Sequence, residues 1–299
     1  MNEKINVNRA INIMAIAIIT IFMVLMANYT LISLAIVPII FAIFLVNEKL
    51  IDSIILLFLL GLISFVLSFT AKINVVFLTA LILGLIISIT IKLDLNDTDA
   101  LIIVFILSAL FLNIFYYYLI RTNAIDISKV IDQVVSMLKN EGLAYPREIL
   151  EKSFRNIPAI LAIIGFIYAL IALKTTRNYL NYKDESFRDF SKINTLKLTI
   201  REVVIGLLLA LLLIGGAKYV GLDQAMVRAN AISIGISLLQ INGIFTMDYV
   251  IEKKQSKVYR IFTWILVFLL FSFLSLFFLI LGGIDLIFNL RGALYARKK

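Results

Sequence analysis

The stretch "VRANAISIGISLLQINGIF", residues 227–245, places polar side chains in an otherwise aliphatic run. On a helix with 100° per residue, four of them fall within about 80° of one another: Asn230, Ser233, Ser237 and Gln240. Arg228 and Asn242 fall on roughly the opposite side. A helix that faces lipid could not present two polar faces, because unpaired amides are costly in hydrocarbon. The pattern therefore predicts a helix that is enclosed by other helices or lines a cavity.

The whole chain has the composition of a membrane protein. Of its 299 residues, 62% are hydrophobic and 16% are charged, and the mean hydropathy is +1.03. Soluble domains are closer to half apolar and a quarter charged. We therefore predict one all-α membrane domain over residues 1–299, a polytopic transmembrane helix bundle with about eight or nine crossings. The predicted spans are 10–27, 30–46, 50–70, 74–91, 100–120, 157–175, 200–220, 226–249 and 260–284.

Two long loops interrupt the spans. In the 121–156 loop, apolar residues recur at helical spacing after Asp126, a candidate N-cap, and stop at Gly142. A second amphipathic piece starts at Pro146, and its Glu148–Lys152 and Glu151–Arg155 pairs are spaced i, i+4. We interpret these pieces as an amphipathic helical hairpin at the membrane surface.

The basic residues predict the orientation of the chain. Seven of them lie in the second long loop, between Lys174 and Arg201 counting both ends, and four more lie between Lys253 and Arg260. The positive-inside rule makes that side cytoplasmic. A count of nine spans then places the tail "RGALYARKK", residues 291–299, on the other side, which the same rule disfavours.

Catalytic chemistry finds little support in the sequence. The chain contains no His and no Cys, which removes imidazole bases, thiolates and the usual zinc and haem ligands. Asp94, Asp97 and Asp99 form an acidic turn that we interpret as a solvated helix cap. We expect no enzyme activity, no cofactor and no metal. The net charge of +9 sits beside membrane spans, so we expect the lipid bilayer as a partner and no nucleic acid.

Three elements of the C-terminal half resemble the YybS-like family of bacterial membrane proteins. They are a span led by Pro158, a span with Gln240 and Gly243, and a final Gly-x-x-Asp that leads into an aromatic residue and an arginine. In this last motif the residues are Gly282, Asp285, Phe288 and Arg291. The resemblance implies a multi-pass protein of the bacterial plasma membrane.

The N-terminal part is similar to the substrate-binding subunits of energy-coupling-factor vitamin transporters. The shared features are a basic N-terminus, a first span rich in alanine and an early short span with a proline. Those subunits use an Ala-x-x-x-Ala face for docking, whereas Ala10, Ala15 and Ala17 do not have that spacing.

Two functions follow as hypotheses. In the first, the protein is a small-solute-binding or transport-related subunit whose polar pocket is formed by Arg228, Asn230, Ser233, Ser237, Gln240 and Asn242. In the second, it is a non-transporting scaffold whose polar face binds another membrane protein of the envelope or division machinery. The polar residues could also serve only to hydrogen-bond neighbouring helices.

Overall fold

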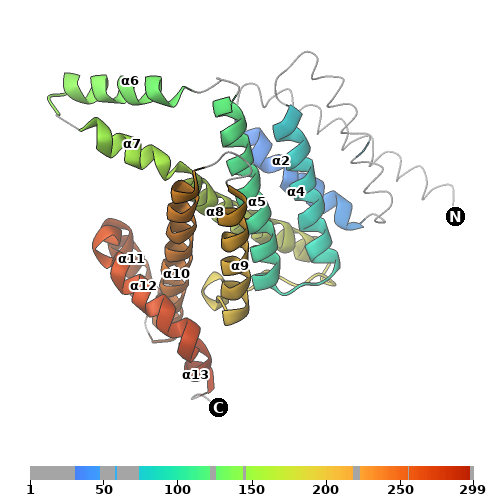
Figure 1. The fold of residues 1–299 in the computed structure, drawn as a ribbon. Helices are drawn as coiled ribbons and strands as arrows, with labels where there is room; N and C mark the ends of the chain where they lie inside the picture. The colour runs from blue at the N-terminus through green and yellow to red at the C-terminus, as the bar shows by residue number, and fades with distance from the viewer. Residues whose placement is uncertain are drawn as a thin grey trace. The chain divides into compact units, whose positions relative to one another are not determined.

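The computed structural model describes residues 31–47, 58, 74–121, 126–143, 146–217, 223–254 and 256–296, and these form helices and connecting turns (Figure 1). The all-α prediction is confirmed for this part of the chain. The helices are α2 (Leu31–Asn47), α4 (Asn74–Lys92), α5 (Asp97–Arg121), α6 (Ile127–Asn140), α7 (Arg147–Arg155), α8 (Ile157–Lys183), the 3-10 helix η1 (Ile193–Thr195), α9 (Ile200–Ala217), α10 (Gln224–Lys254), α11 (Lys257–Leu269), α12 (Phe271–Phe288) and α13 (Leu290–Ala296).

Three of the described helices are long and apolar enough to cross a membrane: Asp97–Tyr117, Ile157–Lys183 and Gln224–Lys253. Shorter apolar helices cover Ala35–Val46, Ala80–Lys92 and Phe273–Phe288. The predicted span 10–27, and the span 50–70 apart from Phe58, lie outside the described residues. The total of eight or nine crossings therefore stays a prediction.

The chain divides into two compact units. Unit 1 comprises residues 1–119 and 164–190, and unit 2 comprises residues 120–163 and 191–299. In unit 1, α2 packs along α4, and Phe41 and Leu81 are fully buried there. The Cβ of a side chain at Gly84 would collide with the carbonyl oxygen of Pro38, so glycine allows the two helices to approach closely.

Unit 1 contains a buried ion pair that the sequence analysis missed. The guanidinium of Arg177 lies 2.7 Å from Asp97, and both side chains are 2% exposed. Arg177 and Arg188 both donate to the carbonyl oxygen of Leu95, and Arg188 also pairs with Asp94 at 3.2 Å. The acidic turn is therefore not fully solvated, because two arginines hold it from outside its own helix.

In unit 2, α6 and α7 form the predicted amphipathic hairpin. Asp126 caps α6 by accepting a hydrogen bond from the backbone of Lys129, and Gly142 follows the helix with φ +76°. The sequence predicts that Glu151 pairs with Arg155. In the structure Glu151 instead pairs with Arg147, at 2.9 Å. Arg147 also reaches Asp132 on α6 at 2.7 Å. The hydrogen bond to Glu151, and then the charge of Asp132, raise the pKa of Arg147.

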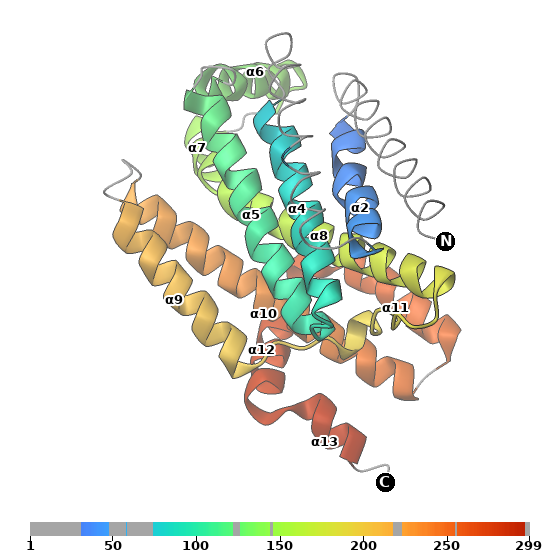
Figure 2. The same cartoon turned by 90° about the vertical axis from the view of Figure 1, so that its right-hand side faces the viewer.

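The long helix α10 is the centre of unit 2. It packs most extensively against α12 and also contacts α9, η1, α11 and α13 (Figures 1 and 2). Gly243 and Gly282 face each other where α10 and α12 meet, and a Cβ on Gly282 would overlap with the carbonyl oxygen of Leu239. Small residues thus bring the two backbones into contact, as in many membrane helix pairs.

The structure differs from the prediction at 260–284, which is not one continuous helix. The chain turns at Leu270 (φ −106°, ψ 16°) between α11 and α12. Near its start, α11 binds Asp248 of α10 through Arg260 and Trp264. After α12, Asn289 lines the same groove as Glu252. The segment is therefore a helical hairpin that returns to the end of α10, where the tail begins.

The two ends of α10 are about a bilayer apart. From Asn230, which contacts Arg155, to Glu252, which contacts Lys192, the helix rises about 33 Å at about 1.5 Å per residue. The hydrocarbon core of a membrane is about 30 Å thick. We therefore expect the α6–α7 hairpin on one side of the membrane, and residues 192–197, 253–257 and 289–293 on the other.

This topology can be measured by cysteine labelling, since the chain has no native cysteine. Ser136→Cys on α6, Ser256→Cys before α11 and Ala293→Cys on α13 each change an exposed position. We add a membrane-impermeant maleimide to intact cells. We expect it to label either Ser136→Cys alone, or the other two variants and not Ser136→Cys. Labelling of Ala293→Cys together with Ser136→Cys would contradict the hairpin and restore a single crossing over 260–284.

The contact between α10 and α12 predicts opposite effects at two neighbouring glycines. Gly282→Ala should destabilise the protein by about 1–3 kcal/mol, because the added methyl group overlaps with the backbone of α10. Gly283→Ala is the matched control, since its Cβ meets nothing within 4 Å, and it should be neutral or stabilising by up to about 1 kcal/mol. Thermal unfolding in detergent compares them, and equal midpoints would contradict the packing.

Candidate functional site

The six residues of the predicted polar pocket occupy different environments along α10. Arg228 is exposed near the start of the helix, and Ser233, Ser237 and Gln240 are half-buried. Asn230 and Asn242 are buried, with 5% and 2% of their surface exposed. The two asparagines lie twelve residues apart, which corresponds to about 18 Å along a helix. They therefore belong to separate clusters.

Asn230 joins α10 to the junction of α7 and α8. Its side-chain oxygen accepts from the backbone N–H of Ala159 at 2.9 Å. Its amide nitrogen donates to the carbonyl oxygens of Arg155 and Met226, both at 2.9 Å. The carbonyl and both amide hydrogens are thus used within unit 2, at a helix junction where backbone groups lack helical partners.

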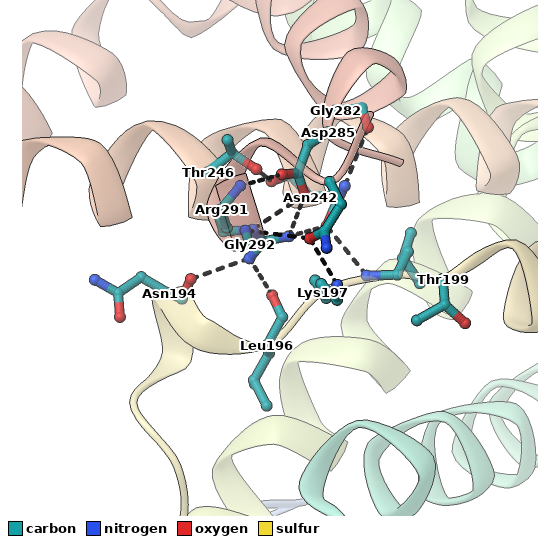
Figure 3. A network of polar contacts seen from close by, with 12 residues as sticks. Asn194, Leu196, Lys197, Thr199, Asn242, Thr246, Gly282, Asp285, Arg291 and Gly292 are labelled. Atoms are coloured by element: carbon teal, nitrogen blue, oxygen red, sulfur yellow. Dashed lines mark hydrogen bonds and ion pairs between the residues drawn. The ribbon is translucent and has the colours of Figure 1, made fainter. Parts of the chain in front are cut away.

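Asn242 joins three segments at the other end of the apolar stretch. Its amide nitrogen donates to the carbonyl oxygen of Gly282 on α12 at 3.1 Å. Its oxygen accepts from the backbone of Leu198 at 3.2 Å and from the guanidinium of Arg291 at 2.6 Å. Figure 3 shows these contacts converging from α10, α12, α13 and the loop before α9.

Arg291 is the centre of this network and is 4% exposed. It binds Asp285 through Nε at 3.0 Å and Nη2 at 2.7 Å. Nη2 also donates to Asn242, while Nη1 donates to the carbonyl oxygens of Asn194 and Leu196. A guanidinium has five N–H groups, and these bonds employ all five. Arg291 therefore holds the structure together and has no hydrogen left for a ligand.

A single residue in the left-handed conformation makes this network possible. Asn289 ends α12 with φ 48° and ψ 54°, a conformation that asparagine tolerates better than most residues. The chain consequently turns, and the backbone N–H of Arg291 donates to Asp285 at 3.1 Å. The sequence analysis noted Asp285 and Arg291 in one motif but missed their contact with the 194–196 loop. Nothing local in the sequence points to that distant loop.

Two further polar residues of α10, Gln240 and Asp248, also contact neighbouring helices. Gln240 donates to the carbonyl oxygen of Ser275 on α12 at 3.3 Å. Asp248 is 4% exposed and accepts from Arg260 and from the indole of Trp264, at 2.7 Å each. Every buried aspartate of unit 2 in the described ranges therefore has an arginine beside it.

An open groove of about 700 Å³ lies next to the Arg291 network. Three separate segments of unit 2 form it: the loop around η1, the end of α10, and the turn between α12 and α13. The lining residues are Lys192, Thr195, Lys197, Tyr249, Glu252, Lys253, Asn289, Arg291 and Gly292. Arg291 is neutralised by Asp285, so the three lysines give the groove an excess of positive charge over Glu252.

Each lysine of the groove is held by a contact with its wall. The ammonium of Lys192 lies 2.6 Å from Glu252, and that of Lys197 donates to the side chain of Asn289 at 2.7 Å. The ammonium of Lys253 lies 4.6 Å from the centre of the Tyr249 ring, within the range of a cation–π contact. A lysine ammonium has three hydrogens, so Lys192 and Lys197 retain donors for an anion.

Breaking the buried ion pair should destabilise unit 2 strongly. Asp285→Asn leaves the charge of Arg291 buried without its counter-ion, at an expected cost of about 3–5 kcal/mol. The double variant Asp285→Leu with Arg291→Met removes both charges, and should cost less than the sum of its single changes. Thermal unfolding in detergent measures the coupling, with exposed Lys152→Gln as the control. Strictly additive effects would contradict a coupled pair.

Comparisons with known proteins place this architecture in one family. Searches of curated proteins and of solved structures each found no match. Residues 14–286 match the model of a family described as "Predicted membrane protein (DUF2232)". This match spans most of the chain, including α10 and α12 as far as residue 286, and so Asp285. The chain therefore belongs to this family of predicted membrane proteins.

Proposed function

We propose that this chain is a non-enzymatic, multi-pass protein of the bacterial plasma membrane that binds a small anionic solute. The binding site is the groove at the end of α10. The observation that carries this proposal is the set of three lysines on one open groove, Lys192, Lys197 and Lys253, with Glu252 as its only acidic lining residue. Cationic side chains that converge on a concave surface are suited to anionic ligands.

This placement shifts the expected pocket along α10, from its middle toward its end. Asn230 and Asn242 use their amide groups to hold helices and loops together. Arg291 lines the groove, but its N–H groups are all bonded within the protein, so it is not expected to bind the ligand. The lysines supply the binding groups, while the Asn242–Arg291 network positions the loop and the tail that present them.

The acidic residues support binding rather than catalysis. A general acid or base needs a carboxyl group whose protonation state can change during the reaction. Asp285 and Asp248 instead form ion pairs with Arg291 and Arg260, so both carboxylates already serve in the packing of unit 2. With no His and no Cys in the sequence, the groove lacks an imidazole base and a thiolate nucleophile.

The apolar surface supports the membrane location. On α9, Leu207, Leu211 and Leu212 are 59–72% exposed, and acyl chains are the natural cover for such a helix. The resemblance that the N-terminal sequence suggests to the substrate-binding subunits of vitamin transporters is a further reason to propose a solute. A transport-related role would use the groove as its site of capture.

The scaffold hypothesis is favoured by a different surface. The α6–α7 hairpin exposes Met137 at 65%, Leu143 at 54% and Ile149 at 44%. An amphipathic hairpin with exposed apolar residues could hold another membrane protein of the envelope. A chain that acts only in this way has no reason to prefer anionic small molecules, so the binding measurement below separates the two functions.

Binding should depend on the charge of the ligand and on the groove lysines. Purified protein is tested by equilibrium binding against pairs of compounds that differ only by a phosphate, such as nucleosides and nucleotides, and against phospholipids with anionic or zwitterionic headgroups. The groove variant Lys192→Gln/Lys197→Gln/Lys253→Gln removes three charges. The matched control, Lys129→Gln/Lys139→Gln/Lys152→Gln, removes three from the α6–α7 hairpin.

We expect the anionic member of at least one pair to bind the wild type and the control more than tenfold tighter than the groove variant, because each surface lysine contributes about 1 kcal/mol. If no anionic compound distinguishes the groove variant from the control, the proposed function is wrong.

A further inference from the structure

A stripe of exposed apolar side chains runs along α12 toward the groove. Its members follow spacings of three and four, and so share one face of the helix. They are Phe273, Leu276, Ile280, Ile284 and Ile287, which are 85, 64, 54, 38 and 68% exposed. The stripe ends two residues before Asn289, which lines the groove. The apolar face of α12 therefore ends close in the chain to the basic groove.

The length of α10 predicts that the groove lies at the depth of lipid headgroups. Asn230 marks the end of α10 that contacts the α7–α8 junction, and Lys253 lies about 35 Å further along the helix at about 1.5 Å per residue. A hydrocarbon core is about 30 Å thick. If one end of α10 meets one membrane surface, the groove meets the other, beside Tyr249, a residue type that favours this interface.

We propose that the groove binds the phosphate headgroup of an anionic phospholipid whose acyl chains lie along the exposed stripe of α12. This inference rests on the proposed function and names the class of its ligand. The phosphate accepts hydrogen bonds from the ammonium groups of Lys192, Lys197 and Lys253. The acyl chains cover Ile280, Ile284 and Ile287, which are exposed on α12.

The chemistry of the groove matches this ligand better than it matches a carboxylate. Lysine ammonium groups act as point charges and bind phosphate oxygens without fixed geometry. Basic pockets beside membrane helices commonly hold phospholipid headgroups. A groove of about 700 Å³ is within the usual size range of small-molecule sites.

The experiment compares lipids and soluble phosphates on the same protein. Native mass spectrometry counts bound lipid on delipidated full-length protein that receives phosphatidylglycerol or phosphatidylcholine with identical acyl chains. Inorganic phosphate and glycerol 3-phosphate are then added as competitors. The variants are the groove triple variant, each of its single Lys→Gln changes, and the hairpin triple variant as control. Because only the intact folded ion is counted, a misfolded variant is not scored as a loss of binding.

We expect the wild type and the hairpin control to retain phosphatidylglycerol in preference to phosphatidylcholine. Each groove lysine that is replaced should weaken this binding by about fivefold. Inorganic phosphate and glycerol 3-phosphate should compete only weakly, because they lack the acyl chains that contact α12.

Two results overturn the inference in different ways. If a soluble phosphate compound displaces the lipid at equal concentration, or binds in a lysine-dependent manner while phosphatidylglycerol does not, the ligand is a water-soluble phosphate. The proposed function then stands without a lipid. If phosphatidylglycerol binds the groove triple variant as tightly as the control, the groove is not the lipid site. If in addition no anionic compound depends on the lysines, the proposed function fails as well.

Discussion

A buried guanidinium is stable inside a protein only when a counter-ion neutralises its charge and all its N–H groups are hydrogen-bonded. Arg291 satisfies both conditions. Its partners come from the end of α12, the middle of α10 and the loop around η1. The most distant of these partners, Asn194, lies 97 residues before Arg291 in the chain. No single segment offers acceptors for all five N–H groups, so the guanidinium is fully hydrogen-bonded only when all three have assembled. The walls of the groove are made of the same segments and depend on this assembly.

The sequence was most informative where the signal is local. The cap at Asp126, the stop at Gly142 and the amphipathic hairpin between them follow from neighbouring residues, and the structure contains all three. The enclosure of Asn230 and Asn242 also followed from physics, since lipid offers an amide no partner. The partner atoms of those amides could not be predicted, because most of them belong to distant segments of the chain.

Two features were beyond the reach of sequence reasoning. The turn at Leu270 lies in a strongly apolar segment with no proline, glycine or charged residue beside it. The hydropathy of this segment therefore predicts a single span. It arises from tertiary contacts, since Asp248 binds α11 while Gln240 and Gly243 bind α12. The buried pair of Asp97 and Arg177 was equally hidden, because each residue sits near a span end where solvation is the default expectation. For the candidate site, the polar residues of α10 could be recognised in the sequence. The groove could not be predicted, because three segments that are distant in the chain form it.

The hairpin of α11 and α12 also bears on how the protein is made. A single helix over 260–284 would require the basic tail that begins at Arg291 to be translocated during synthesis, at a cost of about 2.5–3.5 kcal/mol for each arginine or lysine near the membrane centre. A hairpin enters and leaves the membrane on one face, so the tail stays on that face and crosses nothing. Asp285 then meets Arg291 without either charge having passed through hydrocarbon.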